Sequence, residues 1–315
     1  MPLYLLLGLL TTSAAREDSV VLITGGYSGF PDHNDNGDGL VLSSVEILGG
    51  SCPVPSLPLV LNGHVTVLTQ DGLVLTCGGL DGEEEYNLSC FVLDPATATW
   101  LPHSTLDSPR TFSATVSPPS GVFLLGDDYE FSESSSFLAT GSTRWVPGPQ
   151  LLSPKEDACA ISISATQFLV IGGYPDTGKV EEYDTTTGEW TSWPELTAGR
   201  SYHSCSLIGD TVVIAGGTSD NEPILSTTLL DISSQRQRPG GDMASARAYF
   251  QIVYHEDKLL AIGGQEQDFT GLKTVEEWNP TEEVWTPRGD LDMTIFRAGF
   301  GAVSAPRSAV CAANQ

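Results

Sequence analysis

The sequence predicts an all-β protein assembled from six repeated units. The first observation is a short apolar run that ends in a glycine pair, which occurs five times in full and once in the altered form Gly126-Asp127. The first glycines stand at positions 25, 78, 126, 172, 216 and 263, so the steps are 53, 48, 46, 44 and 47 residues. Self-similarity at such a period indicates a repeat architecture that runs through the whole chain.

Two further sequence markers recur with the same period as the glycine pairs. An apolar or aromatic residue is followed seven positions later by tryptophan in four units: Leu93/Trp100, Leu138/Trp145, Tyr183/Trp190 and Trp278/Trp285. An arginine opens the next apolar run at four places: Arg110, Arg200, Arg247 and Arg297. Each unit also contains four short runs of alternating apolar and polar residues bounded by turn residues. This pattern predicts four antiparallel strands per unit.

Together, the glycine pair, the aromatic/tryptophan pair and the opening arginine resemble the motif of the kelch-repeat family. The resemblance covers about residues 18–305. It implies a six-bladed β-propeller, in which four-stranded blades surround a central channel. Three units depart from the motif. Unit 5 has Gln237 and Arg238 where tryptophan is expected, and unit 3 has Asp127 in place of the second glycine. Unit 1 lacks both the tryptophan and the arginine.

The two ends of the domain are expected to share one blade. Residues 19–26 have the character of a second strand, and residues 297–305 have that of a first strand. The C-terminal strand would therefore complete blade 1 and close the ring, which removes an open edge strand.

Residues 1–15 are expected to be a signal peptide, and residues 16–315 a single propeller domain. The stretch Leu3–Leu10 is apolar, and the small residues Ser13 and Ala15 suit cleavage after Ala15. The alternatives are a buried N-terminal strand and a short membrane anchor, but the run is too short for the ~30 Å hydrocarbon core of a bilayer. The expected location is extracellular.

Six cysteines permit three disulfides in a secreted chain. Cys77 and Cys90 fall on neighbouring strands of blade 2, so this pairing ranks first. An inter-blade bond between Cys159 and Cys205 is conceivable and would leave Cys52 with Cys311, which is one arrangement among the roughly 15 that six cysteines allow. Asn87 begins an N-glycosylation sequon, Asn87-Leu88-Ser89.

The formal net charge of −26 makes binding to nucleic acid or an anionic membrane unexpected. The loops after the glycine pairs, here called the post-glycine loops, span residues 27–40, 80–88, 127–134, 174–178, 218–226 and 265–273. They hold 16 of the 40 acidic residues and one basic residue, Lys273. A binding face for a cationic partner is therefore expected at Asp81, Glu83, Glu84, Glu85, Asp127, Asp128 and Glu130. The alternative is that these carboxylates only keep a secreted protein in solution.

The first post-glycine loop contains a possible calcium site. Asp32, Asn34 and Asn36 followed by Gly37 match the first half of a calcium-binding loop, in which oxygen ligands alternate before a sharp turn. The twelfth position is Ser43 rather than glutamate, so an EF-hand is not expected. Calcium is the one candidate ion, and no other cofactor is expected; the alternative is an Asx-rich hairpin loop.

Catalytic motifs are missing from the sequence, and His203 is expected to pack in the repeat rather than to act in catalysis. We therefore expect a secreted, monomeric, non-catalytic module that binds an extracellular protein or glycan. The resemblance leaves two alternatives. One is a carbohydrate-active enzyme of the sialic-acid mutarotase type, which needs an acid/base group and an arginine. The other is a substrate receptor of a cullin ubiquitin ligase, whose BTB domain has no room before residue 18.

Overall fold

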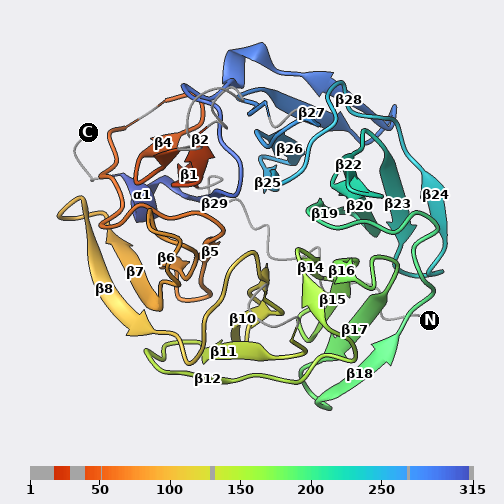
Figure 1. Ribbon diagram of the computed structural model, residues 1–315, viewed down its shortest axis with the longest axis horizontal. Coiled ribbons are helices and arrows are strands. Elements are labelled where there is room, and N and C mark those ends of the chain that lie inside the picture. Colours follow the sequence, from red (N-terminus) through yellow and green to blue (C-terminus); the bar gives the residue numbers. More distant parts are fainter. Residues whose placement is uncertain (1–17, 29–39, 51, 128–131, 268–269, 312–315) are drawn as a thin grey trace.

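A computed structural model describes residues 18–28, 40–50, 52–127, 132–267 and 270–311 of the chain. These residues form six blades arranged in a ring, which confirms the predicted six-bladed propeller (Figure 1). No helix among them has the length and apolar character needed to cross a membrane.

Blades 2 to 6 each contain four antiparallel strands, ordered from the axis outward (Figure 1). Blade 2 consists of β5 (Val65–Leu68), β6 (Val74–Cys77), β7 (Ser89–Asp94) and β8 (Thr99–Thr105). Blade 3 consists of β9 (Ala114–Val116), β10 (Gly121–Leu125), β11 (Ser135–Ala139) and β12 (Trp145–Pro147). Blade 4 consists of β14 (Cys159–Ser162), β15 (Gln167–Ile171), β17 (Val180–Asp184) and β18 (Glu189–Ser192). Blade 5 consists of β19 (Ser204–Ile208), β20 (Thr211–Ala215), β23 (Thr227–Asp231) and β24 (Gln237–Pro239). Blade 6 consists of β25 (Gln251–His255), β26 (Lys258–Ile262), β27 (Val275–Asn279) and β28 (Val284–Pro287).

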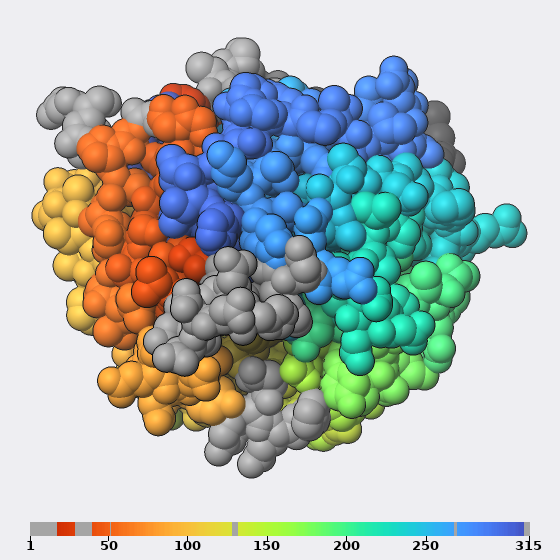
Figure 2. Space-filling view, turned by 45° about the horizontal axis from the view of Figure 1, so that its top comes forward, coloured from red at the N-terminus to blue at the C-terminus, as the bar shows by residue number. Residues whose placement is uncertain are grey.

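Blade 1 joins the two ends of the chain, as predicted. It contains β29 (Gly301–Pro306), β1 (Ser19–Thr24) and β4 (Val45–Ile47), and β29 pairs with β1 from Ser19↔Pro306 to Thr24↔Gly301. The C-terminal segments in blue accordingly adjoin the N-terminal segments in red and orange (Figure 2). The short helix α1 (Arg307–Val310) follows β29. The 3-10 turn η1 (Gly289–Leu291) follows the last strand of blade 6 and comes before β29 in the sequence.

Within the described residues, blade 1 has three strands rather than the four expected. The segment that follows β4 contains Pro53, Pro55 and Pro58, which have no backbone N–H to give to a strand ladder. The segment packs against blade 2 instead, where the indole Nε1 of Trp100 donates to the carbonyl of Pro55 at 3.0 Å.

The described parts of the post-glycine loops lie on one face of the ring, here called the loop face. Several of them form short strand pairs: β2 (Tyr27–Ser28) with β3 (Leu40–Val41), β13 (Lys155–Glu156) with β16 (Tyr174–Pro175), and β21 (Thr218–Ser219) with β22 (Glu222–Pro223). Bridges also join Ser201 to Thr218 and Ala248 to Gln265. The loops therefore emerge at the same end of each blade as the connection that enters its innermost strand.

The tryptophan marker gives the register of the outer strands. Leu93 lies opposite Trp100, Leu138 opposite Trp145, Tyr183 opposite Trp190 and Trp278 opposite Trp285. Trp100, Trp145, Trp278 and Trp285 are buried. Their rings belong to apolar clusters that span two neighbouring blades, as the cluster of Leu229, Leu259 and Trp285 does between blades 5 and 6. The blades are thus held together by apolar burial between sheets.

The glycine pair is the backbone joint between successive blades. Gly216 has φ of +59°, and a Cβ there would lie 2.6 Å from the carbonyl oxygen of Arg247 in the next blade. The N–H of Gly217 donates to that same oxygen at 2.8 Å. Equivalent bonds run from Gly26 to Leu61, Gly79 to Arg110, Asp127 to Lys155, Gly173 to Arg200 and Gly264 to Arg297. A side chain at the first glycine would separate the two backbones.

The opening arginine ties the inner end of its own blade together. Arg200 is fully buried, and its guanidinium donates to the carbonyls of Gly216 at 3.1 Å and Ser226 at 2.8 Å. In blade 4, which lacks the arginine, Lys155 occupies the same place, and its Nζ lies 3.3 Å from Oε1 of Glu181. This lysine was not expected from the sequence, because the repeat marker was defined by arginine alone.

The structure contains three disulfides, Cys77–Cys90, Cys159–Cys205 and Cys52–Cys311. They are the three pairs named from the sequence. The first joins opposed residues of β6 and β7, and the second joins the innermost strands of blades 4 and 5. The third attaches the C-terminal segment to the chain that follows β4. Two of the three therefore add covalent links between parts that are also held by hydrogen bonds and packing.

Candidate functional site

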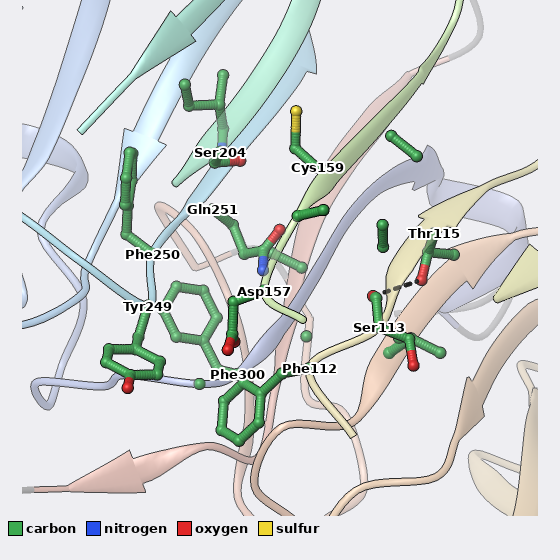
Figure 3. Close-up of a pocket in the computed structure, with 18 of the residues that line it drawn as sticks. Phe112, Ser113, Thr115, Asp157, Cys159, Ser204, Tyr249, Phe250, Gln251 and Phe300 are labelled. Carbon is green, nitrogen blue, oxygen red and sulfur yellow. Dashed lines mark hydrogen bonds between the residues drawn. The ribbon is translucent and has the colours of Figure 1, made fainter. Parts of the chain in front are cut away.

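A cavity of about 310 Å³ lies on the axis of the ring and is here called the axial pocket. The innermost strands of the blades contribute its wall, which includes Ser113, Thr115, Ser204 and Gln251 as polar groups. Figure 3 shows Asp157, Phe112 and Tyr249 grouped at one end of this pocket, with the Asp157 carboxylate turned toward that end. A propeller places such a pocket where all its blades meet, so each blade can supply one side chain at each level.

Six residues form a collar around the loop-face end of the pocket. They stand two positions after the opening arginine or its equivalent: Gly63, Phe112, Asp157, Tyr202, Tyr249 and Gly299. All six have left-handed backbone angles, with φ of +65°, +49°, +54°, +55°, +55° and +60°. Five backbone N–H···O bonds of 2.7–3.1 Å run between neighbouring members of this set. In each blade, the chain thus makes a left-handed turn near the axis, just before the innermost strand begins.

The three aromatic side chains of the collar contact one another across the axis. The ring centroids of Tyr202 and Tyr249 are 4.2 Å apart, and Phe112 meets Tyr249 edge to face at 5.6 Å. The Phe112 ring lies over Gly63, where a Cβ would come within 2.7 Å of it. Glycine in blades 1 and 2 therefore leaves the room that the Phe112 ring from blade 3 occupies.

Asp157 supplies the carboxylate of the collar, and it is 6% exposed. The Tyr202 hydroxyl donates a hydrogen bond to it, and the Tyr249 hydroxyl donates to Tyr202. Burial and the negative charge of Asp157 raise the pKa of both tyrosines well above the ordinary value. Both phenols therefore stay protonated and serve as donors in this chain.

The next level of the wall contains two histidines, and both are held neutral. Burial lowers the pKa of His203 to about 3, with Arg200 adding to the effect. Burial also lowers the pKa of His64 to about 4. The His203 ring packs at Gly172 as Phe250 packs at Gly216, since in each case a Cβ on the glycine would lie 2.7 Å from the ring. This contact agrees with the packing role expected for His203.

A mutarotase-type site would place an arginine beside an acid/base group. Among the described residues that line the axial pocket, Asp157 is the one carboxylate, and none is an arginine. The opening arginines are 0–2% exposed and bond to carbonyls inside their own blades. The described part of the pocket thus offers an acid without the arginine partner.

The predicted binding-face residues have different environments. Glu83, Glu84 and Glu85 are exposed on the loop face of blade 2, and Asp81 caps their turn by accepting from the N–H groups of Glu83 and Glu85. Asp127 requires a correction, because it is 4% exposed. Its Oδ2 lies 2.7 Å from the Arg110 guanidinium and also accepts from Ser132 and Ser134. We therefore place Asp127 inside blade 3, while Asp128 and Glu130 lie outside the described residues.

The predicted glycosylation site Asn87 lies in the loop between β6 and β7 of blade 2. The Asn87 amide donates to the carbonyls of Gly78 and Ser89 at 3.0 Å, and its glycosylation stays a prediction. Asp32, Asn34 and Asn36 lie outside the described residues. The described residues contain no group of three or more His, Cys, Asp or Glu side chains that could hold a metal ion.

The collar was missed by sequence reasoning, although a signal was present. Phe112, Asp157, Tyr202 and Tyr249 occupy a constant position after the opening cation, and the glycines of two blades occupy it as well. Alignment of the six units at this position would have shown a mixed ring of aromatic residues, glycine and one acid. The left-handed backbone that brings these residues to the axis is unusual for bulky side chains and is not readable from their identity.

Comparison with known proteins adds to this description. No family profile matches the chain. Kelch-like protein 33 of Homo sapiens is 33% identical over 115 residues, which are 35% of this chain and 21% of that protein. Kelch-like protein 36 of Mus musculus is 32% identical over 108 residues, which are 33% of this chain and 18% of that protein. Kelch-like protein terF of Aspergillus terreus is 28% identical over 138 residues, or 41% of this chain and 30% of that protein.

The matched segments span about a fifth of the length of the first two relatives. Six blades, of which five have four strands among the described residues and five are tied by a buried arginine or lysine, form a β-propeller of the kelch type. The chain is similar in sequence to these kelch-like proteins over about a third of its length, and this similarity agrees with the kelch-type repeats of the propeller.

Proposed function

We propose that this protein is a secreted, monomeric, non-catalytic module whose loop face binds an extracellular protein or glycan with a cationic surface. The observation that carries the proposal is the exposed acidic run Glu83–Glu85 on the loop face. Exposed apolar side chains lie in other post-glycine loops of the same face, including Tyr174 at 50% and Leu225 at 39% exposure. Carboxylates around apolar groups suit a protein partner that presents lysine or arginine.

The charge of the loop face would act mainly on the rate and specificity of association. Acidic loops with one basic residue among them create a negative field that attracts cationic partners from a distance. Salt screens such a field over ~10 Å at 0.1 M ionic strength. Binding should therefore weaken as salt concentration rises.

Secretion is supported by the three disulfides, because such bonds persist in oxidising compartments. The protein collected from the medium of expressing cells should begin at Arg16 when its N-terminus is sequenced by mass spectrometry. Retention in the cell with residues 1–15 intact would refute this part of the proposal.

The binding role is tested by affinity capture from extracellular fluid. The variant Glu83→Lys/Glu84→Lys/Glu85→Lys should lose the partner that the wild-type protein captures. The matched control is Asp71→Lys/Asp210→Lys/Glu282→Lys, which changes the same charge at exposed turns on the opposite face. Capture that is equal for wild-type protein and the loop-face variant would contradict the proposal.

Calcium binding by Asp32, Asn34 and Asn36 stays a prediction. A ligand that binds only the native state must raise the melting temperature. Calcium should therefore raise the melting temperature relative to chelator in the wild-type protein and leave Asp32→Ala/Asn34→Ala unchanged. If calcium has no effect on the wild-type protein, the site should be abandoned.

A further inference from the structure

We propose that the axial pocket binds an organic cation, the ammonium or guanidinium head of an alkyl chain, between the collar rings of Phe112, Tyr202 and Tyr249 and the carboxylate of Asp157. The inference deepens the proposed function and rests on it for the source of the cation, since a partner on the loop face would present lysine or arginine side chains there. The recognition chemistry itself depends only on the pocket.

The charge of the pocket favours a cation. Asp157 is the one acidic side chain among the described lining residues, which include no lysine or arginine, and it is almost completely buried. The two histidines of the wall are neutral, because burial lowers their pKa values to about 4 and about 3. A carboxylate in a confined space of low dielectric attracts a cation more strongly than the same group does in water.

The walls of the pocket suit the remaining part of such a ligand. The Tyr249 ring lies 4.2 Å from the Tyr202 ring and 5.6 Å from the Phe112 ring beside the carboxylate, and the face of an aromatic ring attracts a cation. The hydroxyls of Tyr249 and Tyr202 form a chain that ends on Asp157 and holds the carboxylate in place. Figure 3 shows that Asp157, Phe112 and Tyr249 approach the same end of the pocket.

The backbone of the collar holds bulky side chains at angles that favour glycine. Phe112, Asp157, Tyr202 and Tyr249 adopt left-handed angles, which are strained for a residue with a Cβ. Glycine at the equivalent Gly63 and Gly299 shows that the fold accepts a residue free of this strain. Bulky residues held in such angles are typical of binding and catalytic sites.

The pocket has the size of a small-ligand site. Its volume of about 310 Å³ falls within the range of ~300–1,000 Å³ that such sites occupy. The Phe112 ring fills the space beside the glycines at positions 63 and 299, so an aromatic side chain also covers the part of the collar that these two blades leave open.

The test is an NMR titration of the full protein with three small probes. These are n-butylammonium, n-butylguanidinium and the neutral n-butylurea, which has nearly the shape of the guanidinium compound. Either cation or both should shift the ring resonances of Tyr202 and Tyr249 and bind at least tenfold more tightly than butylurea. Equal affinity for all three probes would overturn the proposal, as would the absence of any shift.

Variants assign the effect to the collar. Asp157→Asn should weaken binding of the cations at least tenfold, because asparagine tolerates left-handed angles and removes only the charge. Tyr249→Phe, which keeps the ring, should remain within about threefold of the wild-type affinity. If Asp157→Asn does not fold, Asp157→Gly takes its place, since glycine occupies two equivalent positions. Unchanged cation affinity in the folded variant would refute the site.

A last comparison separates this inference from the proposed function. If the partner inserts a side chain, Asp157→Asn should reduce both butylammonium binding and partner capture. If it reduces butylammonium binding alone, the pocket takes a free amine instead. If the wild-type protein does not prefer butylammonium to butylurea but still captures its partner in a charge-dependent way, the inference is overturned and the proposed function stands.

Discussion

Two buried histidines should make the protein sensitive to mild acid. The pKa values of His203 and His64 are lowered to about 3 and about 4, whereas both would titrate near 6.5 in the unfolded chain. The unfolded state therefore binds more protons below pH 6.5, so stability falls as the pH decreases from there toward these folded-state values. At pH 5 each histidine costs roughly 2 kcal/mol.

The variant His203→Phe should remove about half of this acid effect. Phenylalanine already occupies the equivalent position at Phe250 and Phe300, where the ring meets the glycine of the preceding blade in the same way. Urea unfolding at pH 7.5 and pH 5 measures the change in stability for both proteins. An equal loss in the variant and the wild-type protein would show that other groups titrate in this range.

The glycine joint permits a matched pair of substitutions in one blade. Gly216 and Gly209 have nearly the same left-handed φ, +59° and +58°. A Cβ at Gly216 would meet the Arg247 carbonyl at 2.6 Å, whereas nothing lies within 4 Å of one at Gly209. Gly209→Ala should cost about 1 kcal/mol for the backbone angle alone, and Gly216→Ala should cost at least about 2 kcal/mol more. Similar losses of unfolding free energy in urea would refute the joint.

Sequence could predict residue roles only where the role follows from the repeat. The glycine pairs, the tryptophans and the packing of His203 belong to this class. Asp127 was misjudged because acidic residues are usually exposed, whereas here its carboxylate neutralises the buried Arg110. The collar was not predicted because it depends on left-handed backbone angles, and these angles do not follow from the identities of Phe112, Tyr202 and Tyr249.

At the scale of elements, blade 4 shows how one charged pair can replace the arginine anchor. Lys155 and Glu181 are 0% and 2% exposed in their side chains, and Glu181 also accepts from Ser153 at 2.6 Å. Lys155→Met would leave Glu181 buried without its cation and should cost about 3–5 kcal/mol.

Two companion variants make this prediction specific. Lys155→Met/Glu181→Gln should recover part of the loss, because no uncompensated charge remains. Lys155→Arg should stay near wild-type stability, since arginine fills this place in four other blades. Urea unfolding of the three variants provides the measurement. A Lys155→Met protein within about 1 kcal/mol of wild type would contradict the anchoring role.

Strand pairing was largely predictable because alternation, glycine pairs and tryptophan spacing all indicate the same register. That blade 1 has no fourth, outer strand among the described residues was not anticipated. Its cause was visible in Pro53, Pro55 and Pro58, which cannot donate to a ladder, but the repeat pattern was extended over them.

At the scale of the whole molecule, ring closure rests on β29 and on the Cys52–Cys311 bond. This disulfide spans 259 residues, whereas Cys77–Cys90 spans 13. In the chain-entropy description, the longer loop stabilises by about 5–6 kcal/mol and the shorter by about 3 kcal/mol. Cys52→Ser/Cys311→Ser should therefore destabilise more than Cys77→Ser/Cys90→Ser in urea unfolding. The reverse order would contradict this account of closure.

The repeats made the six-bladed ring and its closure predictable, because the residues that pack one blade against the next recur along the chain. Function is less predictable, because it depends on the residues in which units differ. Glu83–Glu85 stand in one loop only, and Asp157 is the one acid at its level of the collar. Such single residues carry no periodic signal, so their meaning emerged only when the blades were placed around one axis.

The central claim is that the acidic loop face binds a cationic partner. Its most direct test is the dissociation constant of the captured partner, measured at 50 and 200 mM salt. For the wild-type protein and the opposite-face variant Asp71→Lys/Asp210→Lys/Glu282→Lys, affinity should be equal and should fall with salt. For Glu83→Lys/Glu84→Lys/Glu85→Lys, it should be at least tenfold weaker at 50 mM salt. Equal dissociation constants for all three proteins would contradict the claim.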